Sequence, residues 1–170
     1  KKNIEIGKNF IHKDKFNIVL GVGSSGPTTK WGVSNYSNLI NKLNLENNFY
    51  FYLLCGKNES NVPNEIIDKI VKKNCSSLHN MTIKQLIPIL TSCNMYVGND
   101  SFGSHITSQS GIKSIVILLD SPRAYTDYSK NFCRIIPRGF DIDKITHGSN
   151  ADPNLVLVED VIKNINRFKN

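Results

Sequence analysis

Apolar runs of strand length alternate along this chain with segments whose apolar residues recur at helical spacing, and this alternation limits the fold more than any other feature. Residues 16–22 (FNIVLGV) form the first apolar run, and residues 34–45 then place apolar side chains three or four positions apart, as on one helical face. Residues 49–55 (FYFYLLC) are apolar throughout, which is typical of a strand covered on both faces. Repeated strand–helix units of this kind predict a parallel sheet with helices on both sides.

The same alternation continues to the end of the chain. Pro63 stands at the expected first position of a second helix that runs to Val71. A third helix is expected from Thr82, which has the spacing of a capping box with Gln85, and Pro88 is expected to kink this helix. Its apolar face is predicted to consist of Ile83, Leu86, Ile87 and Leu90. Further strands are predicted over residues 95–98, 114–119 and 132–136, and further helices over residues 104–110 and 158–168.

These elements fit one domain. At 170 residues and 39% hydrophobic content, the chain suits a single hydrophobic core. Residues 1–15 (KKNIEIGKNFIHKDK) are polar and basic, without the apolar stretch of a signal peptide or membrane span, and are expected to be a lead-in or interdomain segment. Residues 16–170 are predicted to form a Rossmann-like, doubly wound α/β domain with a mostly parallel sheet.

The net charge and the spacing of the cysteines limit the partners and the kinds of chemistry that we expect of this chain. A net charge of +7 favours anionic partners, but Lys and Arg are scattered and no nucleic-acid-binding motif is present, so we expect no nucleic acid partner. Cys55, Cys75, Cys93 and Cys133 form no C-x-x-C pair, which predicts reduced, mostly buried thiols in a cytosolic protein. No His, Cys and carboxylate residues have metal-ligand spacing, so no metal is expected, and the absence of G-x-S-x-G argues against a hydrolase.

Residues 21–31 (GVGSSGPTTKW) contain G-x-G-x-x-G after the first predicted strand, and they raise the question of which phosphate they bind. A dinucleotide site needs a loop that enters a helix directly and an acidic residue at the end of the second strand. Pro27 and Gly32 delay the helix, the second strand ends in LLCG, and no G-K-[ST] of a Walker loop follows. The loop therefore either binds another phosphate or a sugar through its N–H groups and hydroxyls, or only connects two elements.

Residues 97–111 (VGNDSFGSHITSQSG) lead from a predicted strand into a predicted helix. The amino end of a helix carries unpaired N–H groups and partial positive charge, which favour an anion. Gly103 is expected to let a phosphate approach the backbone, and His105 to donate to a leaving diphosphate. The alternative is that His105 is an ordinary surface or core histidine.

The order of four segments resembles one known family. GSSGPTTKW, LLCGKNES, HNMTIKQL and GNDSFGSH follow one another as the motifs do in the carboxyl-terminal half of family 9 glycosyltransferases, the heptosyltransferase-like enzymes. The family's Asp-to-His spacing of five is kept from Asp100 to His105. The chain departs from the family pattern in two places, because Lys30 stands directly before the Trp instead of two residues before it, and Phe102 occupies the usual glycine position.

The resemblance implies one half of a metal-independent, inverting GT-B enzyme. This half is a Rossmann-like domain that holds a nucleotide-diphosphate sugar, and an amino-terminal domain outside these residues binds the acceptor. The resemblance implies catalytic roles for His105 and for Lys30, which balances the diphosphate charge. The donor-binding residues that it implies are Ser24, Ser25, Lys30, Glu59 on the ribose hydroxyls, Met81 at the base, Asp100, Ser101, Phe102, Gly103 and His105.

The resemblance also implies the setting of the reaction. The nucleotide-diphosphate sugar is a substrate and no further cofactor is expected. The acceptor is a glycan or a lipid-linked glycan of lipopolysaccharide or another cell-surface polymer, and the enzyme is cytoplasmic with a peripheral contact to the inner membrane. The chain alone is expected to be inactive in sugar transfer. Two other functions stay open, a non-catalytic nucleotide-sugar-binding module and a sugar-nucleotide epimerase-like domain. Arg123 is expected either to reach an anionic group or to be solvated.

Overall fold

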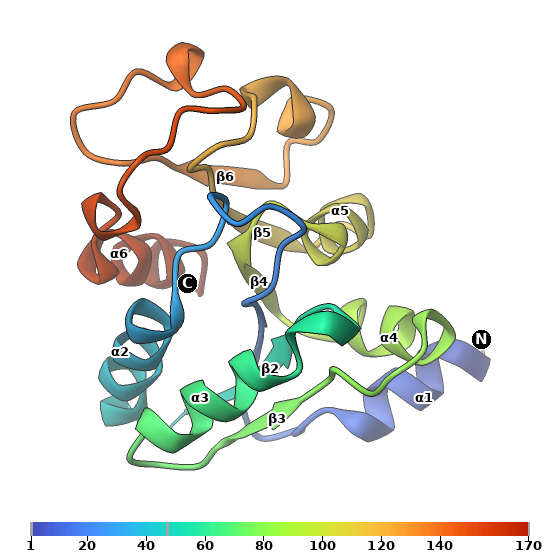
Figure 1. The fold of residues 1–170 in the computed structure, drawn as a ribbon. Coiled ribbons are helices and arrows are strands. Elements are labelled where there is room, and N and C mark those ends of the chain that lie inside the picture. Colours follow the sequence, from blue (N-terminus) through green and yellow to red (C-terminus); the bar gives the residue numbers. More distant parts are fainter. Residues whose placement is uncertain (1, 47, 170) are drawn as a thin grey trace.

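The fold is one sheet of parallel strands between two layers of helices (Figure 1). The computed structural model describes residues 2–46 and 48–169. In these residues six strands pair in the order β3-β2-β1-β4-β5-β6, and every pair is parallel. The strands are β1 (Phe16–Gly21), β2 (Phe49–Leu54), β3 (Cys75–Ser77), β4 (Met95–Asn99), β5 (Lys113–Ile117) and β6 (Phe132–Ile135). The predicted doubly wound α/β domain is confirmed.

The helices divide between the two faces of the sheet. Figure 1 shows α2, α3 and α6 on one face and α1, α4 and α5 on the other. The strand order reverses at β1, which lies between β2 and β4, and ligands of such folds bind at the carboxyl ends of the strands beside this reversal. The helices are α1 (Lys2–Phe10), α2 (Val33–Leu43), α3 (Asn61–Lys69), α4 (Ile83–Leu90), α5 (Phe102–Gln109) and α6 (Val158–Lys169).

Each face of the sheet has its own core. Alternate residues of β1 divide between the two, since Ile18 and Leu20 belong to the core under α2 and α6, whereas Val19 belongs to the core under α4. Trp31 and Tyr36 are fully buried in the first core. Strands β1, β2 and β4 are buried on both faces, which explains why they consist of nearly continuous apolar runs and were predictable.

The segment predicted as a lead-in contains helix α1, which packs against α4. The two helices approach closely at Gly7, where an added Cβ would lie 2.0 Å from the Pro88 carbonyl oxygen. Ile6 and Phe10, large apolar residues of α1, are exposed, so the part of α1 whose side chains the structure describes does not show the buried apolar stripe typical of a surface helix.

Helices α3 and α4 bury only some of the residues that their spacing predicted. α3 ends at Lys69, so Val71 lies outside the helix and is 89% exposed. α4 buries Leu86 and Leu90 as predicted, but Ile83 and Ile87 are exposed and Pro88 and Ile89 are buried instead. The buried face of α4 is therefore rotated toward Pro88 and Ile89, because α1 covers part of its surface.

The start of α4 agrees with the sequence, whereas the short strand β3 does not have a recognisable pattern. Gln85 accepts a hydrogen bond from the Thr82 backbone N–H at 2.9 Å, in agreement with the predicted capping box. Strand β3 is absent from the predicted elements, because its three residues are half-buried and include two serines, so they form no apolar run.

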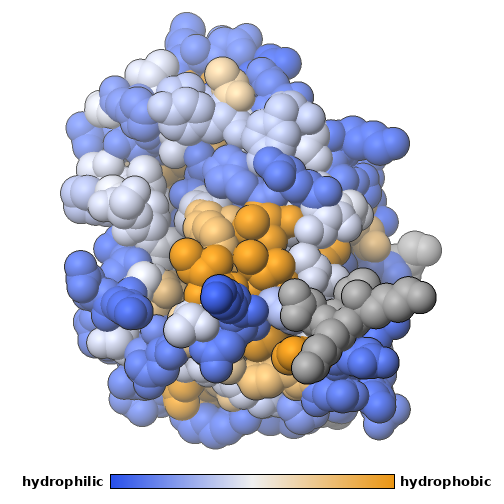
Figure 2. All heavy atoms as spheres, turned by 90° about the vertical axis from the view of Figure 1, so that its right-hand side faces the viewer, coloured by the Kyte–Doolittle hydropathy of each residue, from blue (hydrophilic) through white to orange (hydrophobic). Residues whose placement is uncertain are grey.

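Exposed apolar side chains gather over α4. Figure 2 shows an apolar area on the face of the molecule that α1, α4 and α5 cover. Ile83 and Ile87 of α4 and Ile6 of α1 are among the exposed large apolar residues. Apolar areas of this kind are typical of contact surfaces. Among the described residues, no helix has the length and apolar character needed to cross a membrane.

The four cysteines are free thiols, but only one of them is buried. Cys93 is buried, whereas Cys55, Cys75 and Cys133 are half-buried, so the prediction of mostly buried thiols was wrong for these three. Burial raises the pKa of Cys93 to about 12 and that of Cys55 to about 11. Both thiols are therefore protonated near neutral pH, which makes them poor nucleophiles.

Candidate functional site

The loop after β1 and the start of α5 meet at Asn99, the last residue of β4. The Asn99 side chain is fully buried, and its Oδ1 accepts hydrogen bonds from the Trp31 backbone N–H at 2.9 Å and from the Tyr36 hydroxyl at 3.1 Å. Its Nδ2 donates to the Val22 carbonyl oxygen at 3.2 Å. A single buried amide thus joins both ends of the glycine-rich loop to the strand that leads into α5, so the two predicted segments lie side by side.

Trp31 anchors the end of this loop. Its Nε1 donates to the Val156 carbonyl oxygen at 2.9 Å, and its ring meets the Tyr36 ring edge to face, with centroids 5.0 Å apart. Because Trp31 is fully buried, its role in this conformation is to hold the loop. The side chain is not a surface on which a ligand can lie.

The serines of the loop differ in their surroundings. Ser24 is buried, its hydroxyl bonds to the Thr29 hydroxyl, and its backbone N–H donates to Glu59 at 3.2 Å. Ser25 is exposed. Of the two predicted phosphate or sugar contacts, only Ser25 therefore presents its side chain to solvent.

Lys30 and Glu59, both predicted site residues, form an ion pair with each other. Lys30 Nζ lies 2.6 Å from Glu59 Oε1, which also accepts from the Ser24 N–H, and Oε2 accepts from the Gly56 N–H at 3.3 Å. Both carboxylate oxygens of Glu59 thus have protein donors. Gly23 leaves the space for this carboxylate, because a Cβ there would lie 2.3 Å from Glu59 Oε2. A ribose can take Glu59 only if some of these contacts are exchanged.

Helix α5 begins at the carboxyl end of the sheet, as predicted. Ser101 is the residue before this helix. Its carbonyl oxygen accepts a hydrogen bond from the Ser104 N–H at 3.0 Å, and its own N–H donates to Ser104 Oγ at 3.3 Å. The first turn of a helix leaves N–H groups unpaired along the axis and carries partial positive charge. Phe102, in this first turn, is 43% exposed.

Gly103 is needed for packing, a role that the sequence analysis did not predict. It is buried, and an added Cβ would lie 2.4 Å from Leu54 Cδ2 and 2.9 Å from the Tyr96 ring. The missing side chain of Gly103 therefore lets α5 approach the sheet. Close approach of a phosphate is not needed to explain the glycine.

His105 lies between two polar side chains. Its Nδ1 is 2.6 Å from the Tyr128 hydroxyl, and its Nε2 is 3.2 Å from Asp100 Oδ1. The side chain of His105 is 35% exposed and that of Asp100 is 6% exposed. His105 is thus a partly exposed imidazole held at both ring nitrogens, and its environment differs from that of a core histidine or a free surface histidine.

Two residues at this edge of the sheet have no signal in the sequence. Tyr128 comes from the irregular segment between β5 and β6, and Asp120 follows β5. Asp120 is buried, accepts the Thr28 hydroxyl, and accepts the Ser149 N–H at 2.7 Å. Burial raises the pKa of Asp120, but these hydrogen bonds outweigh it and lower the pKa below its ordinary value.

Two other residues from the sequence analysis lie apart from these contacts. Met81 is half-buried and packs against the core under α4. Arg123 lies 3.2 Å from a carboxylate oxygen of Asp127 and 3.2 Å from one of Asp143, so two carboxylates neutralise it. In this conformation Arg123 is not directed at a ligand.

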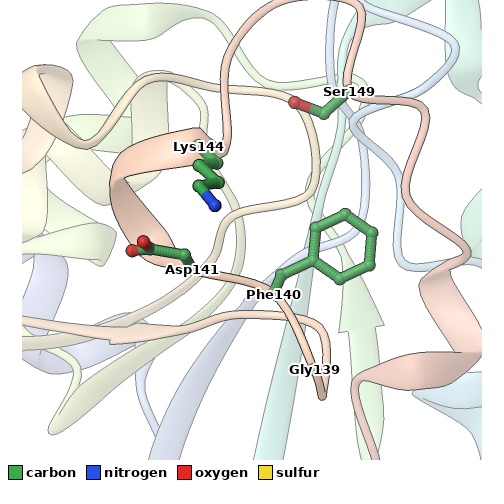
Figure 3. Close-up of a pocket in the computed structure, with 5 residues that line it drawn as sticks. All are labelled: Gly139, Phe140, Asp141, Lys144 and Ser149. Carbon is green, nitrogen blue, oxygen red and sulfur yellow. The ribbon is translucent and has the colours of Figure 1, made fainter.

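A shallow pocket of about 320 Å³ lies in the segment after β6 (Figure 3). Two of its polar side chains already bond within that segment, since Ser149 Oγ donates to the Thr146 carbonyl oxygen at 2.6 Å and Asp141 accepts from the Asp143 N–H at 3.1 Å. We therefore place the candidate site at the ends of β1 and β4. The residues that line the pocket are Gly139, Phe140, Asp141, Lys144 and Ser149, none of which the sequence predicted.

The part of the chain that the structure describes contains no cluster of side chains suited to binding a metal ion. Over residues 2–46 and 48–169, no three or more His, Cys, Asp or Glu side chains gather closely enough to hold a metal ion. The groups near the candidate site that can donate hydrogen bonds to an anion are Lys30, His105 and the amino end of α5.

Comparison with protein families gives one match. Residues 1–131 match the family described as glycosyltransferase family 9 (heptosyltransferase). No curated protein matches the chain by sequence.

Solved structures with the same fold include both heptosyltransferases and an epimerase. E. coli ADP-heptose lipopolysaccharide heptosyltransferase II is similar with 18% identity and a TM-score of 0.80, over 99% of this chain and 51% of that one. The E. coli heptosyltransferase WaaC with ADP gives 15% identity and a TM-score of 0.75, over 97% and 48%. UDP-GlcNAc 2-epimerase from Neisseria meningitidis gives 16% identity and a TM-score of 0.59, over 97% and 40%. The chain thus spans about half the length of the heptosyltransferases it resembles.

Proposed function

Because this chain belongs to glycosyltransferase family 9, we propose that it is the donor-binding half of a heptosyltransferase-like enzyme that transfers a sugar from a nucleotide diphosphate. One observation carries the proposal. Asn99 bonds to Trp31 and lies just before Asp100 and α5, so a diphosphate at the start of α5 also adjoins the glycine-rich loop. This is where doubly wound folds bind their ligands.

Charge supports a diphosphate at this position. When a glycosyl group leaves, negative charge builds on the nucleotide diphosphate, and preorganised positive groups stabilise that charge. The amino end of α5 and the Lys30 amine supply positive charge, and the His105 imidazole supplies a hydrogen-bond donor. Lys30 takes part by exchanging Glu59 for the diphosphate, since its amine is paired with that carboxylate in the free protein. Glu59 is then free to bind ribose hydroxyls.

The remaining parts of the proposal rest on the family. The donor is an ADP-sugar, which agrees with the ADP in the WaaC structure, and the acceptor is a lipopolysaccharide or other cell-surface glycan, bound largely by a part of the enzyme outside these residues. The reaction needs neither a metal nor a further cofactor, because positive side chains and the helix end balance the charge. The enzyme works in the cytoplasm, at the inner face of the membrane where such glycans are assembled.

Calorimetry tests donor binding directly. We expect the protein to bind ADP and an ADP-sugar more tightly than adenosine, because only the diphosphate meets α5 and His105. UDP and a UDP-sugar serve as comparison ligands, and their affinities show whether the site prefers adenine or uracil. Failure of every nucleotide to bind would overturn the proposal.

A second function is favoured by one observation. Lys30 stands one position from the family's usual place and is paired with Glu59, which suits a module that binds a nucleotide sugar without transferring it. Transfer by the full-length protein decides between the two. Donor binding without transfer to any glycan acceptor, and without donor hydrolysis, identifies the module.

A further inference from the structure

Tyr128 and Asp100 hold the His105 ring from opposite sides. The Tyr128 hydroxyl lies 2.6 Å from Nδ1, within the range of a strong hydrogen bond, and the two rings stack with centroids 5.9 Å apart. Phe132 meets both rings edge to face, at 5.9 Å from His105 and 5.5 Å from Tyr128. The hydrogen bond and the ring contacts together fix the position of the imidazole at the first turn of α5.

The contact on the other side determines which nitrogen carries the proton. His105 Nε2 is 3.2 Å from Asp100 Oδ1, a buried oxygen that has no well-aligned hydrogen-bond donor within the described ranges. A bare Nε2 would set its lone pair against this carboxylate, so Nε2 carries hydrogen. In the neutral ring Nδ1 is then an acceptor, and the Tyr128 hydroxyl is its donor.

We propose that Tyr128 is a positioning residue, whose hydroxyl holds the neutral His105 ring with Nε2–H directed to the start of α5. In the free protein the Nε2–H faces Asp100 Oδ1, and on donor binding it exchanges this oxygen for the diphosphate of the sugar donor. This inference rests on the proposed function for the identity of the ligand, but the hydrogen bond from Tyr128 to His105 exists in the free protein. Tyr128 reaches His105 from a segment whose sequence shows no motif. The residue is 51% exposed, so burial in the core does not explain why a tyrosine stands at this position.

The chain offers a matched control for this pair. Tyr125 lies three residues earlier, is 49% exposed, and its hydroxyl is 3.0 Å from Nε2 of His147. Tyr125→Phe therefore removes a similar tyrosine–histidine hydrogen bond from a histidine that is not on α5. Tyr128→Phe keeps the ring that stacks on His105 and removes only the hydroxyl.

The test combines ring-nitrogen NMR with calorimetry on both variants. At a pH where histidine is neutral, Tyr128→Phe is expected to move the His105 Nδ1 resonance toward that of an unbonded acceptor nitrogen. It is also expected to weaken ADP binding by about threefold to tenfold while adenosine binding stays unchanged. Tyr125→Phe is expected to change neither the His105 resonance nor the binding of ADP.

Two results would overturn the inference. An unchanged Nδ1 resonance in Tyr128→Phe shows that the hydroxyl does not bond to the ring, and equal losses for ADP and adenosine show a general structural effect. If the unchanged protein binds no nucleotide, the proposed function and the ligand-directed role of Tyr128 both fail. The resonance of the free protein then still supports or refutes the Tyr128–His105 hydrogen bond by itself.

Discussion

The Thr28 hydroxyl donates to the carboxylate of Asp120, and this hydrogen bond joins the glycine-rich loop to a residue 92 positions further along the chain. The other oxygen of Asp120 accepts the Ser149 N–H at 2.7 Å. One buried carboxylate therefore holds together the loop after β1 and the irregular segment after β6. We expect the order of both loops to depend on it.

Replacing Asp120 by asparagine tests this connection. Asp120→Asn keeps the size of the side chain but removes its charge and places an amide donor where donors already point. We expect the free energy of unfolding to fall by about 1–3 kcal/mol, the usual effect of spoiling buried hydrogen bonds to a charged group. Denaturant unfolding measures the change, and Asp68→Asn on the exposed face of α3 is the control. An equal free energy of unfolding for the two variants would show that the hydrogen bonds of Asp120 do not stabilise the fold.

The contribution of Asp120 is also expected to depend on pH. Burial raises its pKa, but hydrogen bonds from Thr28 and from the N–H groups of Ser149, Gly148 and Asn150 bring it below the ordinary value of 3.8. A carboxylate whose pKa is lower in the folded state stabilises the fold fully above the unfolded pKa and loses this effect as pH falls through the folded pKa. The stability difference between the unchanged protein and Asp120→Asn should therefore be constant above about pH 5 and shrink below about pH 4. A difference that grows on acidification contradicts the assignment.

The regular elements of this fold are predictable because burial dictates their residues. β1 and β2 must be apolar on both faces, and the spacing of Tyr36, Leu39 and Leu43 reflects the one side of α2 that meets the sheet. β3 escapes prediction because an edge strand with two serines needs no apolar run.

The site is predictable only where a motif lies on a regular element. Asp100 follows β4 directly and His105 lies in α5, the next element, so their place at the end of the sheet follows from the predicted strand and helix. Tyr128 and Asp120 reach the same region through long-range contacts of irregular segments, and no local spacing encodes such contacts. Gly103 has a second role that its motif does not reveal, because α5 needs a residue without a side chain there to pack on Leu54.

Gly103→Ala separates packing from ligand contact. The added Cβ has Leu54 Cδ2 at 2.4 Å and the Tyr96 ring at 2.9 Å, so side chains in the core must move. We expect a loss of about 1–3 kcal/mol in the free energy of unfolding, as for other overpacked cores. Gln109→Ala, at the exposed end of the same helix, is the control. Weaker ADP binding with unchanged stability would restore the role in phosphate approach.

His105→Ala tests the diphosphate role that the proposed function gives to the imidazole. Removing a donor to a charged group should weaken ADP binding about tenfold or more, whereas adenosine, which lacks phosphates, should bind as before. Calorimetry with both ligands measures the difference. His147→Ala removes a histidine that bonds to Tyr125 away from α5, and it should leave both affinities unchanged. Equal losses for ADP and adenosine in His105→Ala would refute the diphosphate role.

Lys30→Met distinguishes a residue that binds the diphosphate from one that only holds Glu59. Methionine keeps most of the apolar stem and removes the amine that lies 2.6 Å from Glu59 Oε1. If Lys30 exchanges Glu59 for the diphosphate, ADP binding should fall about tenfold and adenosine binding should change little. If Lys30 only holds Glu59, the freed carboxylate should affect both ligands alike. Lys57→Met, an exposed neighbour of Glu59, removes the same charge and controls for the general effect of net charge on anion binding.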